Sequence, residues 1–69
     1  MRFYLYDFQD WCGALDLTSE DYETDFSADV DDCYDSDTEE WNDEKVRASA
    51  EAQVKAHFGS DAVIVWEFR

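Results

Sequence analysis

The order of hydrophobic and polar positions predicts a strand, a turn and a second strand at the start of the chain. Residues 2–8 are nearly continuously apolar and rich in aromatic side chains, which favours a strand. Residues 9–13 read as a turn, with Gly13 at a position where the backbone needs conformational freedom. Residues 14–17 then predict a second strand, antiparallel to the first. One turn of helix over residues 9–17 is the alternative.

The second half of the chain contains the clearest helix pattern. Apolar residues recur every four positions between residues 43 and 58, which is the spacing of one helix face. Asn42 or Asp43 is the expected N-cap and Gly59 the expected C-cap. Residues 62–68 form an apolar run that predicts the last strand, paired with the first and buried on both faces, or on one face with a subunit interface on the other. The repeating residues are Val46, Ala50, Val54 and Phe58.

Residues 18–34 fit two periodicities. As a helix, one face carries Tyr22, Phe26, Val30 and Cys33. Thr18 with Asp21 resembles a capping box at its start. As a strand, residues 22–30 alternate between apolar or small side chains and acidic or polar ones. The cap favours the helix, and in both cases one side is apolar and the other carries carboxylates.

These elements predict an α+β fold in a single domain of 69 residues. We expect a small, mostly antiparallel sheet of two or three strands with one or two packed helices. Residues 35–38 form a polar break, and residues 39–41 are either a short strand or the start of the next helix.

Charge changes this picture more than any other property. The chain carries 19 acidic and five basic residues, a net charge of −14, and 14 of the carboxylates lie between residues 16 and 44. A magnitude of about 2–8 is enough for solubility. Such a charge disfavours direct binding to nucleic acid or to an anionic membrane, and favours a basic partner surface or a cation. With 45% hydrophobic and 17% aromatic residues, the acidic stretch is expected to be folded.

No catalytic motif accompanies the charge, so we predict a protein that is not an enzyme. His57 is the only histidine and reads as a favourable charge near a helix C-terminus. Cys12 and Cys33 could form one disulfide, but no secretory signal precedes them, so we expect reduced thiols in a cytoplasmic protein. Residues 35–39 have the alternating oxygens that begin a calcium loop but lack its glycine. We predict no cofactor and no dedicated metal site.

Carboxylates held on a folded surface can imitate nucleic-acid phosphates. Phosphates on one strand advance by about 3.4 Å, while outward side chains repeat at about 5.4 Å on a helix and about 6.6–6.8 Å on a strand. Side-chain reach covers either difference, and an apolar backing of Tyr22, Phe26, Val30 and Trp41 would hold the row in place. The predicted partner-binding residues are Glu20, Asp21, Glu23, Asp25, Asp29, Asp31, Asp32, Asp35, Asp37, Glu39 and Glu40.

Three segments resemble the ArdA-type antirestriction proteins, which are acidic DNA mimics of mobile elements. They are residues 3–8, the Gly-Ala-Leu-Asp-Leu run at 13–17, where Leu15 stands at the family's Trp position, and Glu39-Glu40-Trp41 after an acidic run. The resemblance covers about the first 41 residues. It implies a phage or mobile-element inhibitor that acts in the cytoplasm of a bacterial host cell, similar in character to anti-CRISPR proteins.

The sequence therefore predicts an inhibitor that occupies the basic nucleic-acid groove of a CRISPR effector, a restriction enzyme or a similar protein. An adaptor that docks on a basic surface unrelated to nucleic acid is one alternative, and weak Ca²⁺ binding is another. A homodimer is also among the expected arrangements, because an exposed edge of valine and isoleucine invites pairing.

Overall fold

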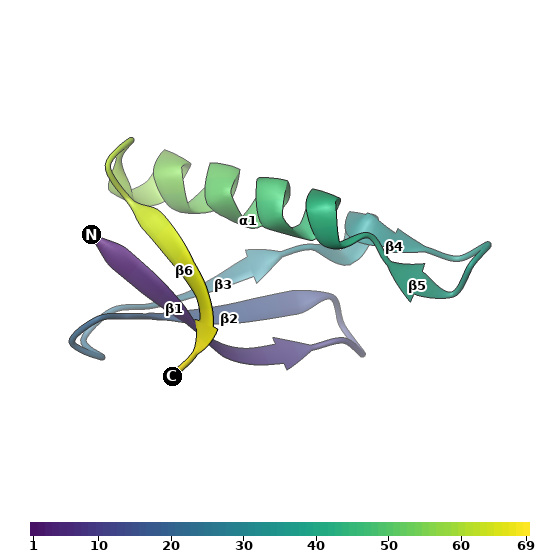
Figure 1. Ribbon diagram of the computed structural model, residues 1–69, viewed down its shortest axis with the longest axis horizontal. Helices are drawn as coiled ribbons and strands as arrows, with labels where there is room; N and C mark the ends of the chain where they lie inside the picture. Colours follow the sequence, from purple (N-terminus) through teal and green to yellow (C-terminus); the bar gives the residue numbers. More distant parts are fainter.

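The computed structural model describes all 69 residues, and its elements form one helix, a four-stranded sheet and a separate small hairpin (Figure 1). The elements in chain order are β1 (Arg2–Gln9), β2 (Ala14–Ser19), β3 (Asp25–Asp29), the short 3₁₀ helix η1 (Asp31–Cys33), β4 (Tyr34–Asp35), β5 (Glu40–Trp41), α1 (Asp43–Phe58) and β6 (Val63–Phe68). The fold is α+β, as the sequence predicts.

The sheet is mixed and has the strand order β3-β2-β1-β6. β2 pairs antiparallel with both β1 and β3, while β6 runs parallel to β1, with Phe3 opposite Ile64. The prediction of a mostly antiparallel sheet of two or three strands was therefore incomplete: the last strand does pair with the first, but in the parallel direction. The reason is that α1 carries the chain back along the sheet before β6 begins, as a crossover to a parallel strand requires.

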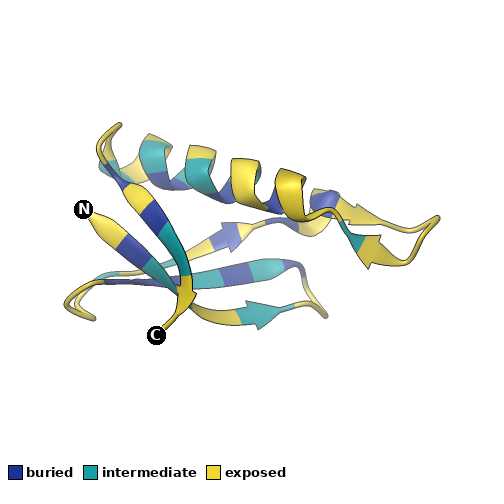
Figure 2. Cartoon of the chain, in the orientation of Figure 1, coloured by how far each residue is buried: buried dark blue, intermediate teal, exposed yellow.

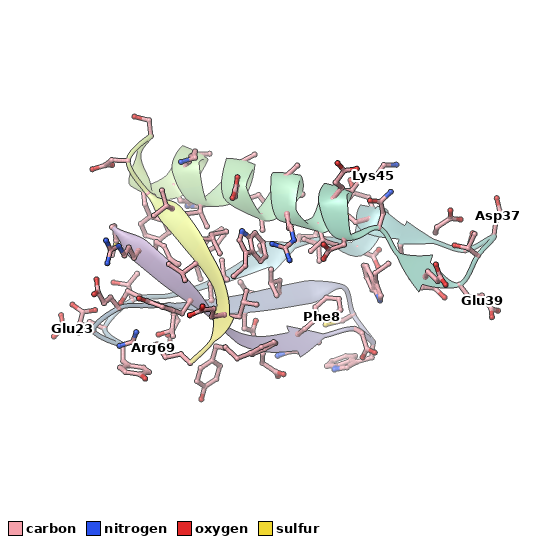
Figure 3. The ribbon with its side chains drawn as sticks, in the orientation of Figure 1. Phe8, Glu23, Asp37, Glu39, Lys45 and Arg69 are labelled. Carbon is pink, nitrogen blue, oxygen red and sulfur yellow. The ribbon has the colours of Figure 1, made fainter.

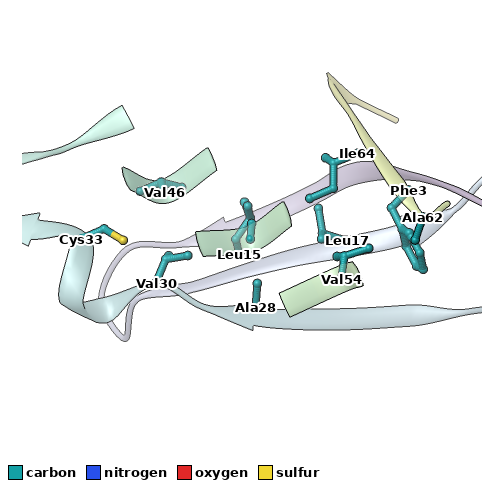
Figure 4. Packing of buried hydrophobic residues seen from close by; sticks show 11 residues of the cluster. Phe3, Leu15, Leu17, Ala28, Val30, Cys33, Val46, Val54, Ala62 and Ile64 are labelled. Carbon is teal, nitrogen blue, oxygen red and sulfur yellow. The ribbon is translucent and has the colours of Figure 1, made fainter. Parts of the chain in front are cut away.

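α1 packs on one face of the sheet and supplies one side of the core (Figures 1 and 2). The predicted four-residue repeat is confirmed, since Val46, Ala50 and Val54 are the buried residues of the helix. The Asn42 side chain accepts a hydrogen bond from the Lys45 N–H, and Gly59 is the C-cap, as predicted. Figure 4 shows the close packing of this cluster; its strand residues are Phe3, Leu15, Leu17, Ala28 and Ile64.

The predicted helix over residues 18–34 is wrong. Thr18 and Ser19 lie in β2, Tyr22 has a φ of +63° in the following turn, and Asp25–Asp29 forms β3. A positive φ is incompatible with a right-handed helix. Asp21, which resembled part of a helix cap, acts in the turn instead: Ser19 Oγ donates to Asp21 Oδ1 at 2.6 Å and accepts from the Thr24 N–H at 3.0 Å.

The alternating pattern holds only over β3 in this stretch, because Tyr22 lies exposed in the preceding turn and residues 31–33 form η1. Phe26 is partly buried, and Ala28 and Val30 are fully buried against the core, while Ser27 and Asp29 between them are exposed. Every second residue of this segment therefore faces α1, so the apolar side chains are buried while the carboxylates stay exposed.

The remaining segments settle two open alternatives. Residues 36–39 form a turn, one residue later than the predicted break, and Glu40–Trp41 is a short strand paired with Tyr34–Asp35, not the start of α1. β6 lies at an edge of the sheet, with Ile64 buried but Val63 and Phe68 exposed by 44% and 67%. Burial of the last strand on both faces is therefore wrong, and a subunit interface on its exposed face stays a prediction.

Candidate functional site

The predicted partner-binding carboxylates follow one path along the long axis of the molecule, which measures 38 × 21 × 16 Å. Figure 3 shows Glu23 near one end and Asp37 with Glu39 at the other. All of them are exposed. We call this set the acidic edge: Glu20, Asp21, Glu23 and Asp25 around the β2–β3 turn, Asp29, Asp31 and Asp32 around η1, and Asp35, Asp37, Glu39 and Glu40 in the β4–β5 hairpin.

The central part of the acidic edge is an edge strand of the sheet. Asp25 and Asp29 are exposed at the two ends of β3, and the register places Asp29 opposite Ala14 and Asp25 opposite Thr18 on β2. Because strand residues alternate between the two faces, both carboxylates lie on the side away from α1. Pairing within the sheet therefore fixes the backbone positions from which the Asp25 and Asp29 side chains project.

Three aspartates of the acidic edge make the same local hydrogen bond. Asp21 Oδ1 accepts from the Glu23 N–H at 3.1 Å, Asp29 Oδ1 from the Asp31 N–H at 3.2 Å, and Asp35 Oδ1 from the Asp37 N–H at 2.9 Å. An aspartate that bonds the backbone two residues on forms an Asx turn, which holds both the loop and the carboxylate. Each of the three groups thus has one carboxylate restrained by its own turn.

The pKa of Asp21 is lowered from its ordinary value. The hydrogen bond from the Ser19 hydroxyl is the main cause, and the Glu23 N–H contributes further. Both donors stabilise the ionised form of the side chain. The Asp21 carboxylate is consequently negative at neutral pH.

Very little of this charge is neutralised within the chain. The structure has two ion pairs: Arg2 with Glu20 at 4.0 Å, where both side chains are well exposed, and Arg47 with Asp43 at 2.9 Å within α1. Only Glu20 of the acidic edge therefore has a basic partner, and exposed pairs of this kind contribute little. The remaining ten carboxylates are free to meet an external cation.

Two arginines lie against aromatic rings, and Arg69 does so at the β2–β3 turn of the acidic edge, where its guanidinium also donates to the Glu20 carbonyl at 2.6 Å. The Arg69 guanidinium lies 4.4 Å from the Tyr4 ring centre and 4.8 Å from that of Tyr22, and Arg47 lies 4.8 Å from the Trp66 ring. Tyr22 is 59% exposed, so it supports Arg69 and does not belong to the apolar backing that the sequence suggested. Val30 is fully buried and Phe26 and Trp41 are partly buried, as that interpretation requires.

One acidic side chain outside the predicted set lies beside it in space. Asp10, in the β1–β2 turn, lines the same pocket as Asp31 of η1. Asp10 lies outside residues 16–44, where the sequence concentrates its carboxylates, and only the close approach of the β1–β2 turn to η1 brings Asp10 near Asp31. The aromatic residues of the same pocket, Trp11, Tyr34 and Trp41, were not predicted to share a site either.

The other candidate chemistry does not assemble. No group of three or more His, Cys, Asp or Glu side chains is arranged to hold a metal ion. His57 packs on Phe26, with ring centres 4.9 Å apart, and makes no hydrogen bond to a cysteine. Cys12 and Cys33 are both free thiols, the first exposed and the second buried, so the disulfide left open by the sequence is not formed. α1 is too short and too polar to cross a membrane.

A scan against protein-family models finds no match, and searches of curated proteins and of solved structures find no significant match either.

Proposed function

We propose that this protein is an inhibitor of the phage or mobile-element type, which occupies the basic nucleic-acid groove of a host defence protein by imitating phosphates. The observation that supports the proposal is the acidic edge, in which ten exposed carboxylates lack a basic partner. A CRISPR effector or a restriction enzyme has the groove that such an edge fits, in agreement with the resemblance to ArdA-type proteins.

The dimensions suit this role. The long axis of 38 Å corresponds to about eleven phosphate steps at roughly 3.4 Å each. A groove built for phosphates presents arginine and lysine side chains at comparable intervals, and an edge that displaces the nucleic acid meets the same cations. Like charge would keep the protein away from DNA and RNA themselves.

Rigidity also supports the proposal. A disordered acidic segment loses conformational entropy when it binds, which lowers its affinity. Here β3 is part of the sheet, the two sides of the hairpin pair at Tyr34–Trp41 and Asp35–Glu40, and the three Asx turns restrain single carboxylates. Most of the ordering is therefore complete before the partner arrives.

The test begins with capture of the partner from a bacterial lysate on the immobilised protein, elution by a salt gradient and identification. The purified partner is then titrated with its labelled DNA or RNA in the presence of this protein. We expect mutually exclusive binding and an affinity that falls steeply between low and physiological salt. A ternary complex with the nucleic acid still in its groove would refute mimicry and favour an adaptor.

Two double variants with equal changes in charge distinguish the contribution of the acidic edge to binding from that of the net charge of the protein. Asp37→Asn with Glu39→Gln removes two negative charges from the hairpin, and Asp61→Asn with Glu67→Gln removes two exposed charges elsewhere. We expect the first pair to slow association several-fold and the second to have a much smaller effect, because rim charges act mainly on the association rate. Equal effects would mean that only net charge matters.

A further inference from the structure

A pocket between the β1–β2 turn and the β4–β5 hairpin combines aromatic rings with carboxylates. Its volume is about 520 Å³, within the range of about 300–1,000 Å³ that is typical of ligand sites. No basic residue lines it. The lining residues are Asp10, Trp11, Asp31, Tyr34 and Trp41.

The aromatic side chains are unusually accessible. Trp11 is 82% exposed and Tyr34 42% exposed, and Tyr34 lies edge-on to the partly buried Trp41 with ring centres 5.1 Å apart. Trp41 also packs edge-on against Phe8, with ring centres 5.1 Å apart. Tryptophan is enriched at the energetic centres of interfaces and is the strongest aromatic partner of a cation. An indole as exposed as that of Trp11 contributes little to the core, so folding does not account for its position.

Backbone contacts hold the walls of the pocket together. The Val30 N–H donates to the Gly13 carbonyl at 2.8 Å, which joins the β1–β2 turn to the segment that carries Asp31. The Asn42 N–H donates to the Cys33 carbonyl at 3.0 Å, which joins η1 to the start of α1. Pairing of Tyr34 with Trp41 fixes the third wall. The three segments are therefore positioned without a ligand.

We propose that this pocket seats one arginine side chain of the basic partner protein. The inference depends on the proposed function for the identity of the partner, and extends it from general charge to one recognised side chain. The guanidinium stacks on the Trp11 indole, while its N–H groups donate to the Asp10 and Asp31 carboxylates.

Arginine fits the pocket better than lysine. Its guanidinium is planar and weakly hydrated, so it can stack on a ring and still donate in its plane to carboxylates at the rim. A lysine ammonium is compact and strongly hydrated, and suits a more enclosed cage. Arginine is also the residue that phosphate-binding grooves use for bidentate contacts, which makes it available in the proposed target.

The experiment uses the full chain and three capped tripeptides, Gly-Arg-Gly, Gly-Lys-Gly and Gly-citrulline-Gly, at physiological salt. NMR follows the indole N–H signals of the three tryptophans. We expect the arginine peptide to shift Trp11 and Trp41 in a saturable manner and to leave Trp66, which does not line the pocket, unchanged. The lysine peptide should shift the same signals several-fold more weakly, and neutral citrulline should not shift them. Equal shifts with lysine, a shift of Trp66 as large as the others, or no shift would overturn the proposal.

Two variants separate this pocket from the acidic edge. Trp11→Ala should weaken arginine-peptide binding roughly 5- to 30-fold, the factor expected for loss of an aromatic anchor. Tyr6→Ala removes another exposed aromatic ring outside the pocket and should change binding less than twofold. If Trp11→Ala leaves both peptide and partner binding unchanged while the hairpin double variant weakens partner binding, the pocket proposal fails and mimicry stands. If the partner binds nucleic acid and this protein together while Trp11→Ala weakens the complex, mimicry fails and the pocket stands.

Discussion

The side chain of Gln53 on α1 makes both of the hydrogen bonds that a neighbouring strand would make to Asp29. Gln53 Oε1 accepts from the Asp29 N–H at 3.0 Å, and Gln53 Nε2 donates to the Asp29 carbonyl at 2.8 Å. β3 is an edge strand, and an open edge invites pairing with other chains. The glutamine amide therefore satisfies the outward-facing backbone groups of β3 at Asp29, in the middle of the acidic edge. It also connects this strand to α1.

Gln53→Ala should free this end of β3. We expect the free energy of unfolding to fall by about 1 kcal/mol, the usual net value for hydrogen bonds of this kind, and the Asp29 amide to exchange faster. Chemical denaturation and hydrogen exchange measure the two effects. Lys45→Ala, which removes an exposed α1 side chain without a bond to β3, should leave Asp29 exchange unchanged; a similar acceleration there would contradict the role of Gln53.

Gly13→Ala should destabilise the fold strongly. Gly13 has a φ of +69°, and a Cβ at this position would lie 2.5 Å from the Asp31 Cα, which is backbone and cannot move aside. We expect a loss of roughly 2 kcal/mol or more, from strain and from separation of the turn and η1. Ser60→Ala is the control, because Ser60 lies exposed in the turn after α1 and does not have a positive φ. Thermal unfolding should show little or no loss for Ser60→Ala.

Ser19→Ala should raise the pKa of Asp21 towards its ordinary value of about 3.9. The Ser19 hydroxyl is the main cause of the low pKa in the folded chain. Because the folded pKa lies below the unfolded one, ionised Asp21 stabilises the fold above about pH 4, and this contribution is lost as the pH falls through the folded pKa. Carboxyl NMR titration measures the shift directly. An unchanged Asp21 pKa in the variant would mean that the Glu23 N–H alone holds it down.

The two cysteines should differ in reactivity. Burial raises the pKa of the Cys33 thiol, and the neighbouring Asp32 carboxylate raises it further, so Cys33 stays protonated and shielded at neutral pH. Cys12 is exposed in the β1–β2 turn. A thiol reagent at neutral pH should therefore modify one site in the folded protein and two after denaturation. Cys12→Ser should abolish the rapid reaction, and fast labelling of that variant would show that η1 opens readily.

Local pattern was sufficient where one periodicity had no competitor. The helix from Asp43 to Phe58 has a polar N-cap, an apolar position every fourth residue and a glycine at its end, so every local signal agrees. The first and last strands are equally clear, since their aromatic and β-branched runs fit a pleated surface. For residues 18–34 the helical and the alternating pattern disagreed. The apparent helix cap favoured a helix, although residues 25–29 follow the alternation of a strand.

The composition and order of the residues by themselves determine that this protein has a charge of −14, a concentrated set of carboxylates and enough aromatic residues to fold around one helix. Tertiary structure decided that residues 25–29 are a strand, because Ala28 and Val30 become buried only when α1 covers them. It also decided that β6 runs parallel to β1, and that Asp10 and Trp11 face Asp31, Tyr34 and Trp41 across one pocket. Contacts between residues distant in sequence depend on how the elements pack, and no local periodicity encodes that packing.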